Sequence, residues 1–136
     1  MSGALSHPLV KRIVAYQAAM AQQDFHEARE IFAPDVVYSV PGSNVLSGLH
    51  VGPDAVMAYF ARLMQMTGGT YGVSDMLWLV NDCKVMLTTR NHATIQGASL
   101  SWTEAIAFEF EGRRKKRIEL FQADQGAVDA FYSRAS

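Results

Sequence analysis

The chain has 136 residues, 49% of them hydrophobic, and its 12 Lys and Arg residues nearly balance 13 Asp and Glu, giving a net charge of −1. This length suits one domain with its own core, and a near-neutral chain lacks the basic field that attracts nucleic acid or an anionic membrane surface. We therefore predict a single domain over 1–136 that binds neither nucleic acid nor a membrane.

Signals for export and for a disulfide framework are both missing from the sequence. The first part of the chain lacks the basic segment and apolar run of a signal peptide, and no stretch reaches the roughly 18 apolar residues of a membrane span. The one cysteine, Cys83, cannot form an intramolecular disulfide, which suits a reducing compartment. These features predict a cytoplasmic protein in which Cys83 is an ordinary strand-edge residue.

Motifs for metals and cofactors are likewise missing. The four histidines lack paired spacing, one cysteine cannot build a structural zinc site, and Gly68-Gly69 follows a predicted helix where a phosphate-binding loop would precede one. We expect neither a metal nor an organic cofactor.

The first half of the chain has the apolar spacing of helices. A helix is predicted over 7–22, and Asp24 can cap a second, short helix that ends near Pro34. Pro53 can occupy the first turn of a third helix over 53–66.

Strand patterns lie on either side of the third helix. A β-branched run over 36–40 predicts a first strand, which Pro41-Gly42 stops. After the third helix the apolar period changes to two, and long antiparallel strands are predicted over 70–80, 84–95, 100–111 and 115–123. Helices followed by a meander of strands indicate an α+β domain with helices on one face of a curled sheet.

Several features of the sequence resemble one known superfamily. The order of elements, with Phe32 to Tyr38, Pro41 to Asn44 and Val128 to Phe131, resembles the nuclear transport factor 2-like superfamily, and most of all its SnoaL-like polyketide cyclase and ketosteroid isomerase branch. The resemblance implies a cone-shaped, cystatin-like α+β fold, in which a curved antiparallel or mixed sheet wraps around three helices and a lipophilic cavity. It also implies a homodimer through the outer face of the sheet. The superfold hosts many activities, so function has to be argued from the cavity.

Strand alternation predicts which side chains face this cavity, because successive residues point to opposite faces of a sheet. It turns Glu104 inward with aromatic neighbours, and it turns Asp75 inward with the apolar residues of its own strand. Burial raises the pKa of a carboxyl group, and two carboxyl groups in one apolar pocket would differ in pKa and supply an acid and a base. The alternatives are a shifted register or an ion pair with Arg62 or Arg90 for Glu104, and a solvated strand end for Asp75.

The resemblance also implies a role for Tyr16, which matches the tyrosine that hydrogen-bonds the substrate oxyanion in ketosteroid isomerases. The other positions depart from the relatives: Val40 replaces the isomerase's general base, Ile106 replaces its assisting carboxylic acid, and Gln122 stands where a cyclase aspartate is expected. The sequence therefore predicts a differently arranged acid/base site. The alternative for Tyr16 is an ordinary amphipathic-helix residue at the rim.

Nine further residues are predicted to line the cavity and bind the substrate, since such a pocket needs a few placed polar groups among apolar walls. They are Tyr38, Val40, Phe60, Met64, Asn91, Trp102, Ile106, Leu120 and Gln122. The alternative for Asn91 and Gln122 is to satisfy backbone groups at strand ends. By the same alternation His92 points away from the cavity, and the basic run over 113–117 is predicted to be a solvated edge.

The leading hypothesis is a cofactor-independent enzyme that cyclises, isomerises or dehydrates a hydrophobic small molecule, such as a polyketide-like secondary metabolite. Its catalytic residues would be Glu104, Asp75 and Tyr16. One alternative is a non-catalytic protein that binds a lipophilic ligand in the same cavity. Another is an adaptor that binds a protein partner through the outer sheet face.

Overall fold

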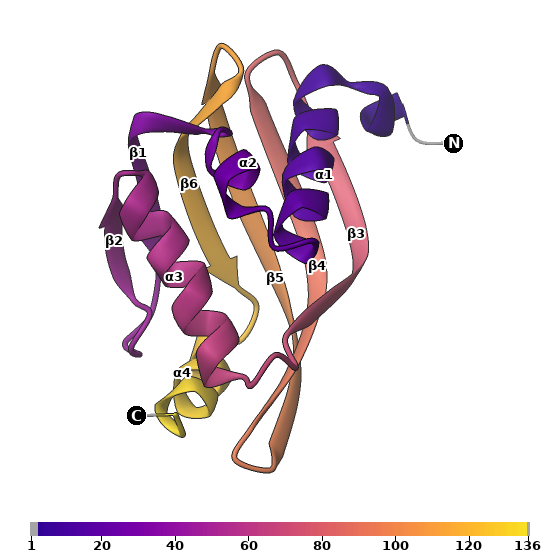
Figure 1. The fold of residues 1–136 in the computed structure, drawn as a ribbon. Helices are drawn as coiled ribbons and strands as arrows, with labels where there is room; N and C mark the ends of the chain where they lie inside the picture. Colours follow the sequence, from indigo (N-terminus) through magenta and orange to yellow (C-terminus); the bar gives the residue numbers. More distant parts are fainter. Residues whose placement is uncertain (1–2, 136) are drawn as a thin grey trace.

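The computed structural model describes residues 3–135 as helices packed on one curved sheet (Figure 1). In chain order the elements are η1 (Gly3–Ser6), α1 (Pro8–Ala21), α2 (Phe25–Arg29), β1 (Phe32–Val40), β2 (Gly48–Val51), α3 (Pro53–Met66), β3 (Gly72–Val80), β4 (Lys84–Ile95), β5 (Ala98–Glu111), β6 (Arg114–Gln122) and α4 (Gln125–Ser133). None of the helices in this part of the chain is long and apolar enough to cross a membrane.

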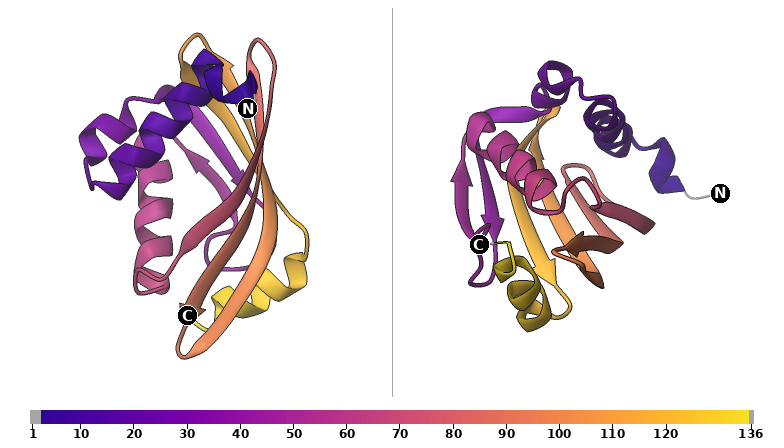
Figure 2. Two further views of the ribbon diagram at one scale, coloured as in Figure 1. Left: turned by 90° about the vertical axis from the view of Figure 1, so that its right-hand side faces the viewer. Right: turned by 60° about the horizontal axis from the view of Figure 1, so that its bottom comes forward.

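The six strands form one mixed sheet in the order β2-β1-β6-β5-β4-β3. Neighbouring strands are antiparallel except β1 and β6, which run parallel. Figures 1 and 2 show α1, α2 and α3 across the concave side of the sheet, while α4 lies at one end of it. This arrangement confirms the predicted α+β fold with a curved sheet around three helices.

The element boundaries differ from the predicted ones in three places. Helix α2 ends at Arg29, so that Ile31 and Phe32 lead into β1 where helix was expected. The loop after β1 contains the short strand β2, which pairs with β1. A further helix, α4, follows the last strand and is capped by Asp124, whose side chain accepts a hydrogen bond from the Ala127 amide.

Two segments far apart in the sequence meet at the end of β1. Asp129 on α4 accepts hydrogen bonds from the Ser43 amide at 3.2 Å and from Asn44 Nδ2 at 2.7 Å. Gly42, with φ of +91°, approaches α4 so closely that a Cβ atom there would lie 2.2 Å from Gln125 Nε2. The turn after β1 and the C-terminal helix are therefore one structural unit that closes this end of the sheet.

The core lies between the concave face of the sheet and the helices. Val10 and Ile13 of α1, Val56 of α3, and Val36 and Val85 of the sheet are almost completely buried. Burying each such side chain contributes roughly 1.5–3 kcal/mol, so this layer holds the helices against the sheet. What the core does not fill is the cavity described next.

Candidate active site

A cavity of about 150 Å³ lies between helices α1 and α3 and the concave face of the sheet. Its walls are mostly apolar and aromatic, with a few polar and ionisable groups. The lining residues are Ile13, Tyr16, Gln17, Phe32, Tyr38, Phe60, Tyr71, Val73, Leu87, Thr89, Glu104, Ile106, Phe108, Lys115 and Ile118. A cavity of this size holds a ligand of about one aromatic ring.

Glu104 faces this cavity from β5 and is 6% exposed, so the predicted inward register is observed. Its Oε1 atom accepts hydrogen bonds from Trp102 Nε1 at 2.9 Å and from Gln122 Nε2 at 3.1 Å. Burial raises the pKa of the Glu104 carboxyl group, and hydrogen bonds from Trp102, Gln122 and Asn91 oppose part of that rise. A carboxyl group in this setting can hold a proton closer to neutral pH than an exposed one.

The alternative ion pairs for Glu104 are not observed. Arg62 and Arg90 are both exposed, and Arg90 instead donates a hydrogen bond to Thr103 Oγ1 at 3.1 Å on the outer face of the sheet. Glu104 is therefore held by neutral donors, which leave its charge uncompensated.

A chain of neutral polar groups surrounds the carboxyl group. Thr89 Oγ1 donates to Asn91 Oδ1 at 2.6 Å, and Asn91 Nδ2 donates to Tyr71 Oη at 2.7 Å. Asn91 is fully buried, so its amide orients other side chains in the interior and does not serve a strand end. The Gln122 Oε1 atom is buried without a hydrogen-bond partner among residues 3–135.

Tyr16 projects into the cavity from α1. Its ring makes an edge contact with Phe32, and its hydroxyl group is buried without a hydrogen-bond partner in the described chain. Burial raises the pKa of the Tyr16 hydroxyl, with a smaller contribution from Tyr59, so the group stays protonated. A buried, unpartnered O–H group can donate to an oxygen atom of a bound ligand.

The remaining predicted lining residues fall into three groups. Tyr38, Phe60 and Ile106 line the cavity, and Tyr38 Oη donates to Tyr59 Oη at 3.4 Å. Trp102, Asn91 and Gln122 contact Glu104, as described above, but do not themselves line the cavity as predicted. Val40 and Leu120 are buried in the core and do not line the cavity.

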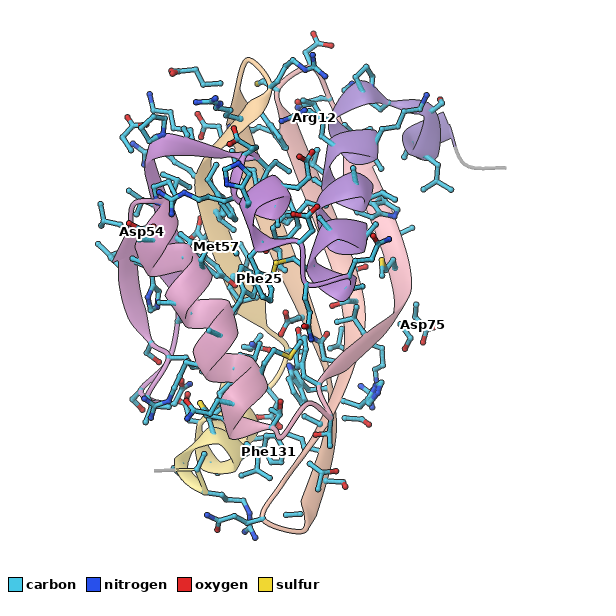
Figure 3. The ribbon with its side chains drawn as sticks, viewed as in Figure 1. Arg12, Phe25, Asp54, Met57, Asp75 and Phe131 are labelled. Carbon is cyan, nitrogen blue, oxygen red and sulfur yellow. The ribbon has the colours of Figure 1, made fainter. Side chains whose placement is uncertain are left out.

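Two predicted site residues, Met64 and Asp75, are exposed on the surface. Met64 is 45% exposed on α3, because it lies on the solvent side of the apolar stripe that buries Leu63. Asp75 is exposed, and Figure 3 shows it at the edge of the molecule beside β3, directed away from the helices. The expectation of a second carboxyl group facing the cavity is wrong.

A bulge in β3 explains the position of Asp75. The register with β4 shifts between Ser74 and Leu77, and Asp75 has φ of +53°. This extra residue reverses the alternation, so that Leu77 turns outward and Trp78 turns toward the core.

Lys115 is a cavity residue that the sequence does not predict. It belongs to the basic run 113–117, predicted to be solvated, yet it is 2% exposed and lines the cavity. The pairing of β5 with β6 shifts between Glu109 and Phe110, which turns Lys115 inward where simple alternation from Ile118 would turn Lys116 inward. No signal in the basic run marks this bulge.

The Lys115 ammonium group is surrounded by aromatic rings. Its Nζ atom lies 4.2 Å from the ring centre of Phe108, 4.4 Å from that of Tyr16 and 5.6 Å from that of Phe32. No acidic side chain of residues 3–135 lies within 4 Å of it. Burial lowers the pKa of Lys115 from 10.5 to about 7, and no charged neighbour contributes to the shift.

The chemistry of the cavity follows from this pair of groups. Burial makes the Glu104 carboxyl group easier to protonate and lowers the pKa of the Lys115 amine to about 7, so both side chains can take part in proton transfer. Among residues 3–135 no three His, Cys, Asp or Glu side chains gather where they could hold a metal ion.

The sequence matches the model of one known protein family. The model of the SnoaL-like domain family matches residues 13–118. An uncharacterised protein of Mycobacterium tuberculosis is 35% identical over 117 residues, which cover 85% of this chain and 89% of that protein.

Solved structures show the same fold. A protein from a soil-derived mobile gene cassette superposes with a TM-score of 0.85 at 28% identity, over 92% of this chain and 96% of that one. A protein of unknown function with a cystatin-like fold from Xanthomonas campestris gives 0.81 at 25% identity, over 91% and 97%.

Proposed function

The chain belongs to the SnoaL-like domain family, and from that premise we propose that it is a cofactor-independent enzyme that performs general acid/base chemistry on a hydrophobic small molecule. The reaction would be a cyclisation, isomerisation or dehydration, each of which removes a proton from carbon and returns a proton elsewhere. The observation that carries the proposal is Glu104, a buried carboxyl group held by neutral donors in the wall of an apolar cavity.

The geometry supports a role for each of two groups. Glu104, in its carboxylate form, removes the proton, and the same group in its acid form returns it. Tyr16 donates its unpartnered hydroxyl group to the oxygen that becomes negatively charged. Apolar walls exclude water, which strengthens both interactions in the transition state.

The size of the cavity limits the substrate. About 150 Å³ admits a single ring or a short conjugated chain, and a fused polyketide would require the helices to move away from the sheet. A structure described as a candidate polyketide cyclase from Xanthomonas campestris has this fold at 17% identity and a TM-score of 0.67, which supports the fold and leaves the substrate open.

The experiment uses 5-nitrobenzisoxazole, a small aromatic compound that opens to a coloured phenolate when a base removes its ring proton. We expect the protein to accelerate this opening, with a rate that rises as Glu104 ionises, and we expect Glu104→Gln to lower the rate roughly 100-fold or more. The matched control is Glu109→Gln, which changes a carboxyl group on the outer face of the same strand.

Retention of the full rate by Glu104→Gln would show that Glu104 is not the base. Binding of the compound without acceleration by the unmodified protein would favour the second candidate, a non-catalytic protein that holds lipophilic ligands in the same cavity.

A further inference from the structure

Lys115 is a cavity group that the acid/base proposal does not use. Its Nζ atom lies among the rings of Phe108, Tyr16 and Phe32, and its side chain has no ion pair with any described residue. A methionine or leucine would fill the same volume without burying a charge, so packing does not explain a lysine at this position.

The surroundings of the amine contain no charge that would hold it in the ammonium form. The titratable groups of the cavity are Tyr16 from α1, Tyr38 from β1, Tyr71 before β3 and Glu104 from β5. The three tyrosines are neutral because burial raises the pKa of each hydroxyl group. Phe108, which contacts Lys115, lies four positions after Glu104 on β5, about 13 Å along the strand. Both groups line the cavity, and Glu104 does not contribute to the lowered pKa of the Lys115 amine.

We propose that Lys115 is a nucleophilic amine that forms an imine with small apolar aldehydes or ketones bound in the cavity. A neutral amine in a desolvated pocket is the form of lysine that attacks a carbonyl carbon. The nitrogen lone pair forms the new C–N bond and the amine transfers its two protons to the carbonyl oxygen. The C–O bond then breaks, water leaves, and the product is a C=N bond between Lys115 and the ligand.

The inference deepens the proposed function and rests on the same cavity. An imine at Lys115 becomes positively charged on protonation and withdraws electrons through a conjugated ligand, which acidifies C–H bonds several atoms away. Glu104, which lines the same cavity, would take such a proton. The substrate class is therefore a conjugated carbonyl compound of about one ring.

The test is reductive trapping with benzaldehyde and sodium borohydride at pH 7, followed by peptide mapping. Reduction of the imine leaves Lys115 heavier by the mass of benzaldehyde less one oxygen atom. At pH 7 the neutral fraction of an amine with a pKa near 7 is roughly a thousand times that of an ordinary lysine. We expect labelling of Lys115 to exceed that of Lys11, Lys84 and Lys116 roughly tenfold or more, and toluene as a non-reactive competitor to reduce only the label on Lys115.

Matched variants separate the inference from a general reactivity of lysines and from the acid/base proposal. Lys115→Met should lose this label, whereas Lys116→Met, which removes the neighbouring lysine paired with Glu111, should keep it. Glu104→Gln should also keep the label on Lys115, since imine formation with benzaldehyde needs no carbon proton.

Equal labelling of all lysines, or a label on Lys115 that toluene does not reduce, overturns the inference. If Lys115 stays unlabelled in a protein that still opens 5-nitrobenzisoxazole, the imine proposal is wrong and the acid/base proposal is unaffected. A labelled Lys115 in a protein whose Glu104→Gln variant keeps full activity overturns the role of Glu104 alone.

Discussion

Glu104 and Lys115 are both buried ionisable side chains whose charged forms the cavity disfavours. Burial raises the pKa of Glu104, so any stabilisation from its protonated form is lost as pH rises through that raised value. Burial lowers the pKa of Lys115, so the folded state binds fewer protons than the unfolded chain between pH 7 and 10.5. Each group costs stability near neutral pH, which is typical of side chains kept for a functional site.

The cost of Lys115 leads to a prediction about stability. Lowering its pKa from 10.5 to about 7 corresponds to a cost on the order of 4–5 kcal/mol at neutral pH. We expect Lys115→Met to raise the free energy of unfolding at pH 7 by on the order of 2–5 kcal/mol, because methionine fills the aromatic pocket without a charge.

The stability of the unmodified protein should itself depend on pH. Because the unfolded chain binds more protons than the folded state in this range, the free energy of unfolding should rise from pH 7 to pH 9.5, by up to about 1.4 kcal/mol per pH unit.

Urea denaturation at several pH values measures both effects. The difference between Lys115→Met and the unmodified protein should shrink as pH rises, while Lys84→Met, an exposed control, should change little at any pH. A pH-independent gain, or no gain, would mean that Lys115 remains charged and hydrated in the folded protein.

The strands show how far alternation alone can predict a site. On β4 and β5 the register is continuous around Glu104, and the residues expected to face inward are the ones that do. On β3 and at the β5–β6 turn, one-residue bulges reverse the alternation. Alternation therefore predicts that Asp75 faces inward and Lys115 outward, and the structure shows the opposite for each.

Bulges escape prediction here because their sequences do not differ from those of ordinary strands. Asp75 adopts its positive φ without a neighbouring glycine, and the bulge at Lys115 falls within a uniformly basic run. The helices and long strands were predictable from apolar spacing, whereas β2 and α4 depend on contacts made only in the folded chain. Helix α4, for example, is held through Asp129 to the turn after β1.

The β3 bulge itself provides the next prediction. Because Asp75 is exposed, Asp75→Asn should open 5-nitrobenzisoxazole at the unmodified rate, in contrast to Glu104→Gln.

The positive φ of Asp75 leads to a prediction about stability. Because glycine accepts positive φ without a steric cost, Asp75→Gly should raise the free energy of unfolding by about 0.5–1 kcal/mol. Ser74→Gly, at a neighbouring residue with ordinary φ, should instead lower it. Loss of activity in Asp75→Asn would return this residue to the site, and destabilisation by Asp75→Gly would contradict the role assigned to the bulge.

The outer face of the sheet carries exposed apolar side chains. One row of paired residues crosses β3 to β6 as Leu77, Thr88, Ala105 and Phe121, and Leu77 and Phe121 are 59% and 45% exposed. The next row is Leu79, Met86, Ala107 and Glu119. Most side chains in these two rows are small or apolar, and Glu119 is the charged exception, so the rows suit packing against a second sheet.

We therefore expect a homodimer that packs through this outer face, with the two cavities turned away from each other.

Phe121→Glu places a charge in the apolar row and should convert the dimer to a monomer, because an unpaired charge buried in an interface costs several kcal/mol. Leu49→Glu is the matched control, since Leu49 is 69% exposed on β2 at the other end of the sheet. Light scattering coupled to size-exclusion chromatography measures the mass of each variant. Activity on 5-nitrobenzisoxazole should survive in the Phe121→Glu monomer, because the cavity lies on the concave side of the sheet and Phe121 is exposed on the outer face. A monomeric unmodified protein, or a dimer that Phe121→Glu leaves intact, would exclude this face as the interface.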